Sequence, residues 1–300
     1  MTNKCKFFLS FFLQTDGTKN IGLSERSKYF KEGKIWECTS RIHTDLWAQN
    51  RYIVPNINLR LVLWRGSPRF HIISPDPDPD YELEILRSYL IVHYIDAAPA
   101  LTQSVNELLS SAGSALYYLS LSKLKTVTIS KGDGSCSITD VFSSGSLPQE
   151  LVFCLVRSAN FRGSWNSNPF QLEHANISSI LTQIDEEPSP YSTAITCDFS
   201  KEFYSEIYNN LFTVNPYGVF GESGKKCAIT KKEFLQGTTI FRVVFSPVDQ
   251  NILQPTPRSG KLSLDITFRE NLKESYTLIL YAKFPAVLEL TSSGQIQLKA

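Results

Sequence analysis

The chain has 300 residues, and its 30 Lys and Arg against 29 Asp and Glu leave a formal net charge of +1. Direct binding to nucleic acid depends on a basic surface that displaces counterions from phosphates, and Lys and Arg form no run longer than a pair here, so the composition argues against it. Aromatic residues make up 12% of the chain, and this wealth of strand-favouring residues indicates a β-rich globular protein of one or two domains.

The first 22 residues predict a tail. Their apolar run, residues 7–13, is interrupted by Ser10, is too short to span a bilayer and is followed by no small-residue cleavage site. We therefore interpret residues 1–22 as an exposed tail or an imperfect gene start, and we expect neither a membrane segment nor secretion.

The first half of the chain predicts strands followed by one helix. Apolar residues alternate over residues 57–64, as in a half-buried strand, and residues 81–95 predict a long strand or a bulged pair of strands. The Pro-Asp repeat of residues 75–80 predicts a stiff loop between them. Residues 101–118 carry apolar side chains at helical spacing, and Gly113 is placed to end that helix, so we put a domain boundary between residues 112 and 113.

The second half predicts short strands and a single helix. The expected strands cover residues 123–129, 150–156, 171–184, 229–234, 238–245, 261–268 and 276–284. A Gly-Asp-Gly sequence at residues 132–134 and the Asn-Pro-Phe of residues 168–170 predict turns, and residues 204–212 predict the helix because their apolar residues fall on one stripe. Many short strands separated by turns predict an all-β antiparallel sandwich.

No pattern of polar residues predicts catalysis. Arg41, His43 and Asp45 alternate and would share one face of a strand, where a His–Asp pair could serve a nucleophile. No Gly-x-Ser-x-Gly sequence completes a triad, so a charged strand face is the preferred interpretation. The aspartates of residues 76–80 lack the Gly and Glu of a calcium loop, and residues 218–226 lack the spacing of a phosphate-binding loop.

The cysteines and histidines indicate no metal site. The six cysteines, at positions 5, 38, 136, 154, 197 and 227, form no close pair, and the four histidines are scattered, whereas zinc sites use clustered Cys and His. We interpret all six thiols as reduced, which fits the cytosol or nucleus. The glycosylation sequon at Asn176 falls inside an expected strand and is interpreted as a chance occurrence. The sequence thus predicts no enzyme, no cofactor, no metal and no small-molecule substrate.

Short motifs follow one another in a fixed order from about Gly22 to the end of the chain. In the first half they are Arg41-Ile42-His43 with Asp45-Leu46-Trp47, Arg51-Tyr52-Ile53 with Asn56, the apolar residues 59–63, and Phe70. In the second half they are Gly145 with Leu147-Pro148, Phe161 with Gly163, Asn168-Pro169-Phe170, the aromatic helix 204–212, and Gly260, Leu262, Leu264, Phe268, Tyr281 and Phe284. In this order the motifs resemble the double jelly-roll major capsid proteins of Polinton (Maverick) elements and related adenovirus-lineage, hexon-like viruses.

Two departures from that family's pattern stand out. Residues 244–247 read Val-Phe-Ser-Pro where the family has Phe-Asp-Leu-Thr-Pro, so this turn is expected to be remodelled. The early strands of the family's first jelly roll precede the position equivalent to Gly22, and unrelated residues stand there here. The resemblance therefore implies an N-terminally truncated copy: a truncated gene product, a decayed element copy or a host-retained fragment.

The resemblance implies a fold and a role. It implies a remnant of a first jelly roll over residues 23–112 and a complete second jelly roll over residues 113–300. The role would be structural, in a virion, with homotrimers packed beside neighbouring capsomers and assembled in the host cytoplasm or nucleus. The motif residues to name are Asn168, Pro169, Phe170, Gly163, Arg41, His43 and Asp45. Pro169 is expected to fix φ, and Phe170 to anchor the turn in the core.

A β-sandwich recognition module, secreted or at the cell surface and lectin-like, is the alternative interpretation, because a fold alone does not fix a function. Export, a glycan on Asn176, oxidised cysteines or binding to sugar would favour it.

Overall fold

The computed structural model describes residues 25, 27–40, 42, 44–48, 51–54, 57–74, 80–143, 145–212, 229–245, 258–291 and 295–299. Contacts group the chain into two compact units, which are described separately. Unit 1 comprises Met1–Glu37, Gly66–Tyr81 and Ser122–Phe284, and unit 2 comprises Cys38–Arg65, Glu82–Leu121 and Pro285–Ala300. The two longest strands each contribute one part to unit 1 and the other part to unit 2.

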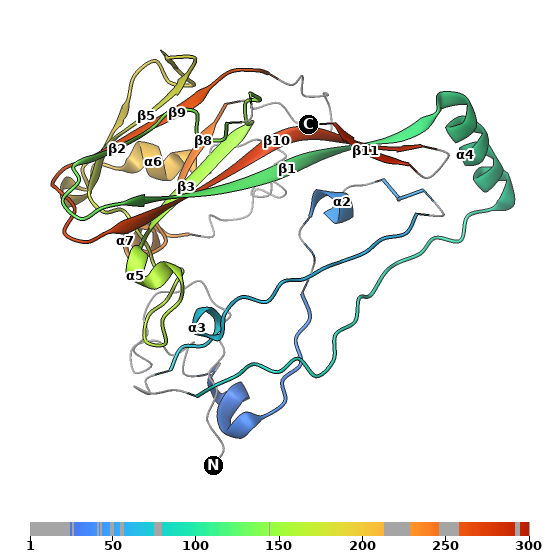
Figure 1. Cartoon of the computed structure of the whole chain (residues 1–300), viewed down its shortest axis with the longest axis horizontal. Coiled ribbons are helices and arrows are strands. Elements are labelled where there is room, and N and C mark those ends of the chain that lie inside the picture. Colours follow the sequence, from blue (N-terminus) through green and yellow to red (C-terminus); the bar gives the residue numbers. More distant parts are fainter. Residues whose placement is uncertain are drawn as a thin grey trace. The chain divides into compact units, whose positions relative to one another are not determined.

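Two antiparallel sheets form the framework (Figure 1). The first runs in the order β1 (Ser114–Ile129), β10 (Tyr276–Thr291), β3 (Glu150–Arg157) and β4 (Leu172–Glu173), with β8 (Phe241–Val244) also paired to β3 and β11 (Ile296–Lys299) to β10. The second runs in the order β2 (Ser135–Ile138), β9 (Leu262–Phe268), β5 (Ile177–Ile184) and β6 (Glu187–Pro188), with β7 (Ile195–Thr196) also paired to β5.

The strand order is that of a jelly roll. Eight strands form the roll; in chain order they are β1, β2, β3, β5, β7, β8, β9 and β10. One sheet has the order β1–β10–β3–β8, which is first, eighth, third and sixth along the chain, and the other has the order β2–β9–β5–β7, which is second, seventh, fourth and fifth. Such an order arises when a long hairpin pairs its first strands with its last and then rolls up, so that successive pairs fall in alternate sheets. The predicted antiparallel jelly-roll sandwich is therefore confirmed for the part of the chain that begins at β1.

The core of unit 1 is built from the apolar residues of its strands, which alternate most regularly in β9. Along β9, Leu262, Leu264, Ile266 and Phe268 are buried while the residues between them are not. The expected strands at residues 150–156, 261–268 and 276–284 are confirmed, because each carries enough apolar side chains on one face to be held against the opposite sheet.

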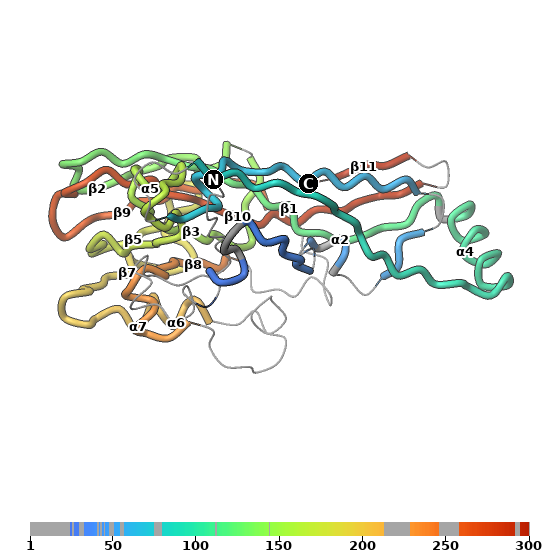
Figure 2. Tube along the Cα trace, turned by 90° about the horizontal axis from the view of Figure 1, so that it is seen from below, coloured from blue at the N-terminus to red at the C-terminus, as the bar shows by residue number. Residues whose placement is uncertain are grey.

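Helices α6 (Ser205–Asn210) and α7 (Lys231–Leu235) lie next to each other in unit 1 (Figure 2). The helix expected at 204–212 is confirmed in a shorter form. The strand expected at 229–234 is wrong, because Thr230 and Glu233 form a capping box that starts α7 and buries Phe234. The remaining helical segments of unit 1 are η1 (Lys28–Gly33), α3 (Pro68–His71), α5 (Ser158–Phe161) and η2 (Phe199–Lys201).

Unit 2 contains α2 (Asp45–Ala48), α4 (Pro99–Ala112), β11 and the outer parts of β1 and β10. The helix expected within residues 101–118 is confirmed as far as Ala112, where it ends because Gly113 adopts a left-handed φ of 81° and donates its N–H to the Leu109 carbonyl. Residues 114–118 belong instead to the strand β1, which begins directly after Gly113, at Ser114. The division of the chain into two jelly rolls at residue 113 stays a prediction.

Besides residues 229–234, three more expected strands differ from the structure. Residues 57–64 and 81–95 belong to no ladder among the described residues, and most of their apolar side chains are exposed. A strand exists only with a partner for its main-chain groups, which alternation within one segment does not supply. The strand expected at 171–184 is split into β4 and β5, because Ala175 and Asn176 adopt φ values of 45° and 52°.

The predictions of a tail over residues 1–22, of a stiff Pro-Asp loop and of a loop at residues 218–226 concern residues 1–24, 75–79 and 213–228, which lie outside the described residues. Cys5 and Cys227 lie outside them as well. Cys38, Cys136, Cys154 and Cys197 are free thiols. In the described part of the chain no helix is long and apolar enough to cross a membrane, and no three His, Cys, Asp or Glu side chains lie where they could hold a metal ion.

Candidate functional site

The motif residues of the two halves meet at one place in unit 1. We call it the motif junction and define it as residues 66–74 together with residues 160–170. Gly163, which follows α5, has a φ of 85°, and a Cβ on it would lie 2.5 Å from the carbonyl oxygen of Arg69 and 2.6 Å from the amide nitrogen of Phe70. The two backbones therefore approach so closely that only glycine fits.

Hydrogen bonds fix both sides of the junction. The amide of Ser74 donates to the carbonyl of Trp165 at 2.7 Å, and the amide of Gly163 donates to the carbonyl of Asn160 at 2.9 Å. On the 66–74 side, Ile72 and Ile73 are buried beside Ser74. The junction thus ties a segment from the first half of the chain to the loop that follows β3.

The Asn-Pro-Phe turn is held by its asparagine. Asn168 is 2% exposed, and its Oδ1 accepts the amide hydrogen of Phe170 at 2.9 Å, while its carbonyl accepts from Gln171 at 3.2 Å. Pro169 is buried next to it. An asparagine that bonds to the backbone two residues ahead is a turn-forming arrangement that needs no ligand.

The expected role of Phe170 is wrong. Its side chain is 46% exposed, so it does not anchor the turn in the core. Its ring instead packs edge-on against Phe70, with ring centroids 5.3 Å apart. The sequence order brought both phenylalanines into the same set of motifs, and the structure brings them into contact across the motif junction.

The other predicted site residues are not brought to this place. Arg41 and His43 lie outside the described residues, and Asp45 begins the short helix α2 rather than continuing a strand. The shared strand face expected for the three residues is therefore not formed at Asp45, because the helical turn there breaks the two-residue repeat. A role for Arg41 and His43 stays a prediction.

In unit 2, Tyr117 on β1 holds the segment that contains Arg51 and Tyr52. The Tyr117 hydroxyl donates to the carbonyl of Tyr52 and accepts from the amide of Val54, both at 3.0 Å, and the residue is 3% exposed. Arg51 donates from Nη1 to the carbonyl of Leu116 at 3.0 Å. No local sequence pattern indicates this contact, because Tyr117 lies near the end of the segment 101–118 that predicts a helix.

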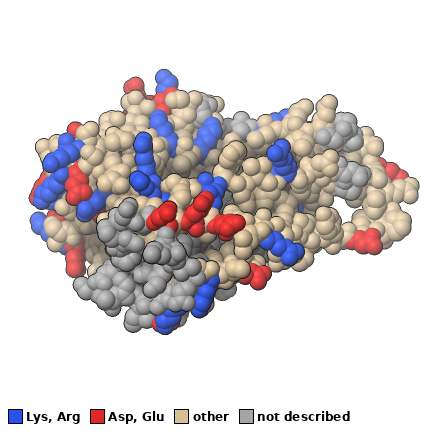
Figure 3. All heavy atoms as spheres, turned by 60° about the horizontal axis from the view of Figure 1, so that its bottom comes forward, with Lys and Arg blue, Asp and Glu red and all other residues tan. Residues whose placement is uncertain are grey.

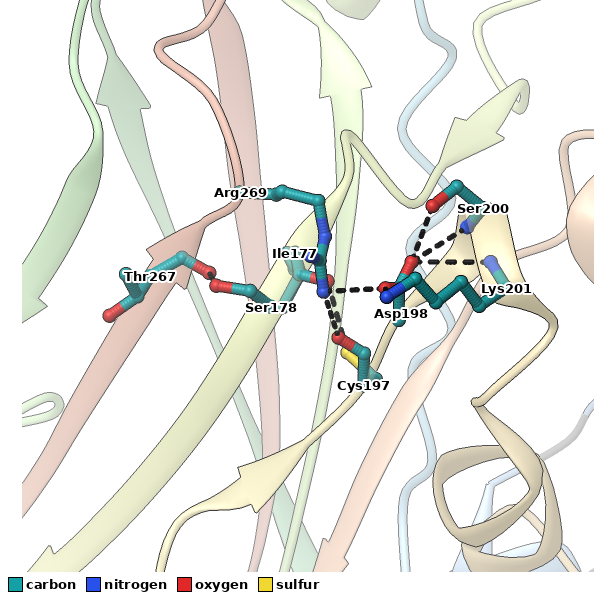
Figure 4. A network of polar contacts seen from close by, with 8 residues as sticks. All are labelled: Ile177, Ser178, Cys197, Asp198, Ser200, Lys201, Thr267 and Arg269. Carbon is teal, nitrogen blue, oxygen red and sulfur yellow. Dashed lines mark hydrogen bonds and ion pairs between the residues drawn. The ribbon is translucent and has the colours of Figure 1, made fainter.

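A buried carboxylate organises the turn after β7 (Figure 4). Asp198 is 6% exposed, and its Oδ1 accepts from the amides of Ser200 and Lys201 and from the Ser200 hydroxyl. Its Oδ2 lies 3.0 Å from Nη2 of Arg269. The hydrogen bond from Ser200 contributes most to holding the pKa of Asp198 below its usual value, with Arg269 acting in the same direction.

The neighbours of Asp198 are structural as well. Burial raises the pKa of the Cys197 thiol to about 12, so the group stays protonated, and it donates to the Ile177 carbonyl at 3.0 Å. Arg269 also donates to the Cys197 carbonyl at 3.3 Å. A thiol that is neutral and already bonded is not a nucleophile, so the network ties β7, η2 and the end of β9 together rather than forming a reactive centre.

Two further polar groups brace the first sheet. Arg242 on β8 and Glu150 on β3 form an ion pair of 3.1 Å with side-chain exposures of 6% and 17%. Glu173 accepts from Tyr276 at 2.8 Å and from Arg157 at 2.8 Å. Burial raises the pKa of Tyr276 to about 12, and the bond to Glu173 adds to that shift. The ion pair links two strands of this sheet, and Glu173 on β4 links its strand to both β3 and β10.

The exposed surface is unevenly apolar. Most of the large apolar side chains that are exposed belong to unit 2, and they concentrate in residues 57–64 and 85–95. Trp64 is 92% and Tyr94 is 89% exposed. On the face drawn in Figure 3, positive and negative side chains are interspersed and wide areas carry neither. The exposed apolar side chains of residues 57–64 and 85–95 are therefore a candidate contact surface.

No known protein-family model matches the chain. It is 20% identical over 261 residues to an uncharacterized protein of Caenorhabditis elegans, an alignment that covers 85% of this chain and 61% of that protein.

Solved structures to which the chain is similar include the mavirus major capsid protein, with a TM-score of 0.35, 10% identity and coverage of 62% of this chain and 41% of that one. The PBCV-1 virus capsid matches with a TM-score of 0.36 and 13% identity, over 65% of this chain and 54% of that one. The structure of the Sputnik virophage matches with a TM-score of 0.37 and 12% identity, over 62% of this chain and 39% of that one. The chain thus spans 61% of the curated relative and between 39% and 54% of these three chains. At such TM-scores the fold assignment rests on the strand order of the two sheets.

Proposed function

We propose that this chain is a structural subunit of a protein shell, a capsid-type jelly-roll protein of a Polinton-type element or a related double-stranded DNA virus. The proposal takes its element and virus from the order of sequence motifs. It is supported by the strand order of the jelly roll and by the meeting of Phe70, Gly163 and the Asn-Pro-Phe turn at the motif junction.

The observation that carries an assembling role is the exposed apolar surface of unit 2. In a monomer, Trp64 and Tyr94 would each leave about nine-tenths of the side chain in water within strand-like apolar segments, which is unfavourable. Self-association into trimers beside neighbouring capsomers, in a virion or in the host cytoplasm or nucleus, is the arrangement that we propose by the family resemblance.

Light scattering on the purified chain as it leaves a sizing column tests this function. We expect a discrete oligomer, a trimer if the family arrangement holds. A chain that stays monomeric up to the highest soluble concentration, with an intact near-ultraviolet circular dichroism spectrum, would contradict the assembling role.

One observation favours the recognition module as a second candidate. Asn176 is not inside a strand, as the sequence led us to expect, but is exposed in the turn between β4 and β5, where a glycan would not disturb the core. Expression through a secretory pathway, followed by glycosidase treatment and mass measurement, tests this candidate. A mass shift that is absent from Asn176→Gln would support export, and an unmodified chain would count against it.

A further inference from the structure

Two segments of unit 2 have the sequence of strands but not the pairing. We call them the arms and define them as residues 57–65 and residues 82–95. Both run extended (Figure 1), and neither belongs to a ladder among the described residues. Their side chains are mostly exposed, whereas strands with this apolar content are normally covered on at least one face.

The arms lie together at one end. Arg65, at the end of the first arm, donates from Nη1 to the carbonyl of Leu83 in the second, and its Nη2 lies 3.8 Å from Glu82. Both contacts are made by the Arg65 side chain, and the carbonyl of Leu83 is the one main-chain group of the arms that they use. The arms are therefore held in place as strand edges.

We infer that the arms are bound by a second copy of this chain, which adds its own strands to them through main-chain hydrogen bonds. This inference rests on the proposed assembling function and names the surface that performs it. Strand addition suits the arms because extended main chain gives the affinity and alternating apolar side chains give the specificity.

The exposed area is sufficient for a stable interface. Thirteen large apolar side chains of the arms are exposed: Leu59, Leu61, Val62, Leu63, Trp64, Ile85, Leu86, Tyr89, Leu90, Ile91, Val92, Tyr94 and Ile95. Each presents on the order of 100 Å², so together they offer more than roughly 1,000 Å². A stable protein–protein interface needs about 800 Å² from each partner.

A second copy is the occupant that the chemistry favours. Every copy carries the same uncovered arms, so copies of the chain can cover one another's arms. The arms contain Arg60, Arg65 and Arg87 but also Glu82 and Glu84, and the whole chain has a net charge of +1, so like copies do not repel strongly. Exposed Trp and Tyr are the side chains that most often dominate such contacts.

Hydrogen exchange of the full-length chain, followed by mass spectrometry over a concentration series, tests the inference without any substitution. We expect peptides from residues 57–65 and 82–95 to gain protection as the chain associates, while those from β9 stay protected throughout. Arms that are protected at every concentration, including in the monomer, would mean that the chain covers them itself. Arms that remain unprotected in the oligomer would overturn the inference.

Substitution gives the second readout. The double variant Trp64→Asp with Tyr94→Asp should weaken self-association at least tenfold, because it places charges in the contact. The matched control is Phe203→Asp, which changes a side chain of unit 1 that is 64% exposed and should leave association unchanged. If the wild-type chain associates and the double variant does so equally well, the arms are not the surface and the assembling function stands. If the wild-type chain is monomeric, the assembling function itself fails.

Discussion

Gly163 and Arg69 lie with their backbones in direct contact, although 94 positions separate them in the sequence. The carbonyl oxygen of Arg69 occupies the space where the Cβ of any other residue at position 163 would stand, at 2.5 Å. Gly163 also has a φ of 85°, which residues with an L side chain rarely adopt. Both reasons for glycine act at one position, and the position joins the two sides of the motif junction.

Gly163→Ala is therefore expected to destabilise the chain strongly. The left-handed backbone alone costs about 1–2 kcal/mol for a residue with a Cβ, and the clash with a backbone carbonyl, which cannot swing away as a side chain could, adds to it. We expect a total of about 3 kcal/mol or more in the free energy of unfolding, measured by urea denaturation.

Gly132→Ala is the control for this prediction. Gly132 has a φ of 95°, but nothing lies within 4 Å of the Cβ that alanine would add. It carries the backbone penalty without the clash, so its loss of stability should be no more than about 1–2 kcal/mol. Equal losses for the two variants would show that the close approach to Arg69 contributes nothing.

In the Asn-Pro-Phe turn, substitution of the first residue is expected to reduce the free energy of unfolding more than substitution of the last. Asn168→Ala removes the acceptor of the Phe170 amide in a site that is 2% exposed, which should cost about 1–2 kcal/mol. Phe170→Ala removes a ring that is already half in water and should cost less than about 1.5 kcal/mol. Thermal and urea unfolding of both variants measure the order, and a larger loss for Phe170→Ala would restore the role that the sequence suggested for it.

The sequence predicted what depends on neighbouring residues. The alternation of Leu262, Leu264 and Ile266 predicted β9 because every residue of the pattern lies in the strand itself. The same reasoning is wrong for residues 57–64, which pair with no other segment in the described part of the chain, because pairing depends on two segments. The capping box of Thr230 and Glu233 was a local signal that predicts α7, and the apolar neighbours masked it.

Contacts between distant residues could not be derived from local pattern. Tyr117 bonds to residues 63 and 65 positions away, and no periodicity in its own segment indicates this. The colinear motifs included Phe70, Gly163 and Phe170, but they did not predict that these residues are in contact at the motif junction. The family resemblance therefore identified residues of the motif junction, whereas their arrangement follows from packing that only the structure shows.

The ion pair between Arg242 and Glu150 predicts a large cost for removing one partner. Glu150→Ala would remove the carboxylate that lies 3.1 Å from the guanidinium of Arg242, whose side chain is 6% exposed, and breaking such a buried pair costs about 3–5 kcal/mol. Lys273→Ala is the control, because the pair of Lys273 and Glu270 has side-chain exposures of 88% and 66% and should contribute less than about 1 kcal/mol. The two variants are compared by their urea midpoints, and similar midpoints would contradict the structural weight given to the buried pair.

Stability is also expected to fall with falling pH in two separate ranges. Burial holds the pKa of His174 below its usual 6.5, and its ring stacks on Phe199 with centroids 4.2 Å apart. The folded state keeps this histidine neutral while the unfolded chain binds a proton, so its contribution is complete above pH 6.5 and is lost as the pH falls below that value. His174→Phe should flatten this part of the profile.

Asp198 acts at lower pH with the same sign. Its folded pKa lies below 3.8, so the unfolded chain takes up the proton first, and the stabilisation that is present above pH 3.8 disappears as the pH drops through the folded value. Asp198→Asn should lower stability at neutral pH, since Arg269 loses its carboxylate partner, and should remove the acid-dependent part of the profile. Urea unfolding from pH 3 to pH 8 of the wild-type chain and of the two single variants separates the ranges. A profile for Asp198→Asn that stays parallel to the wild-type profile at acid pH would show that this carboxylate is protonated equally in both states.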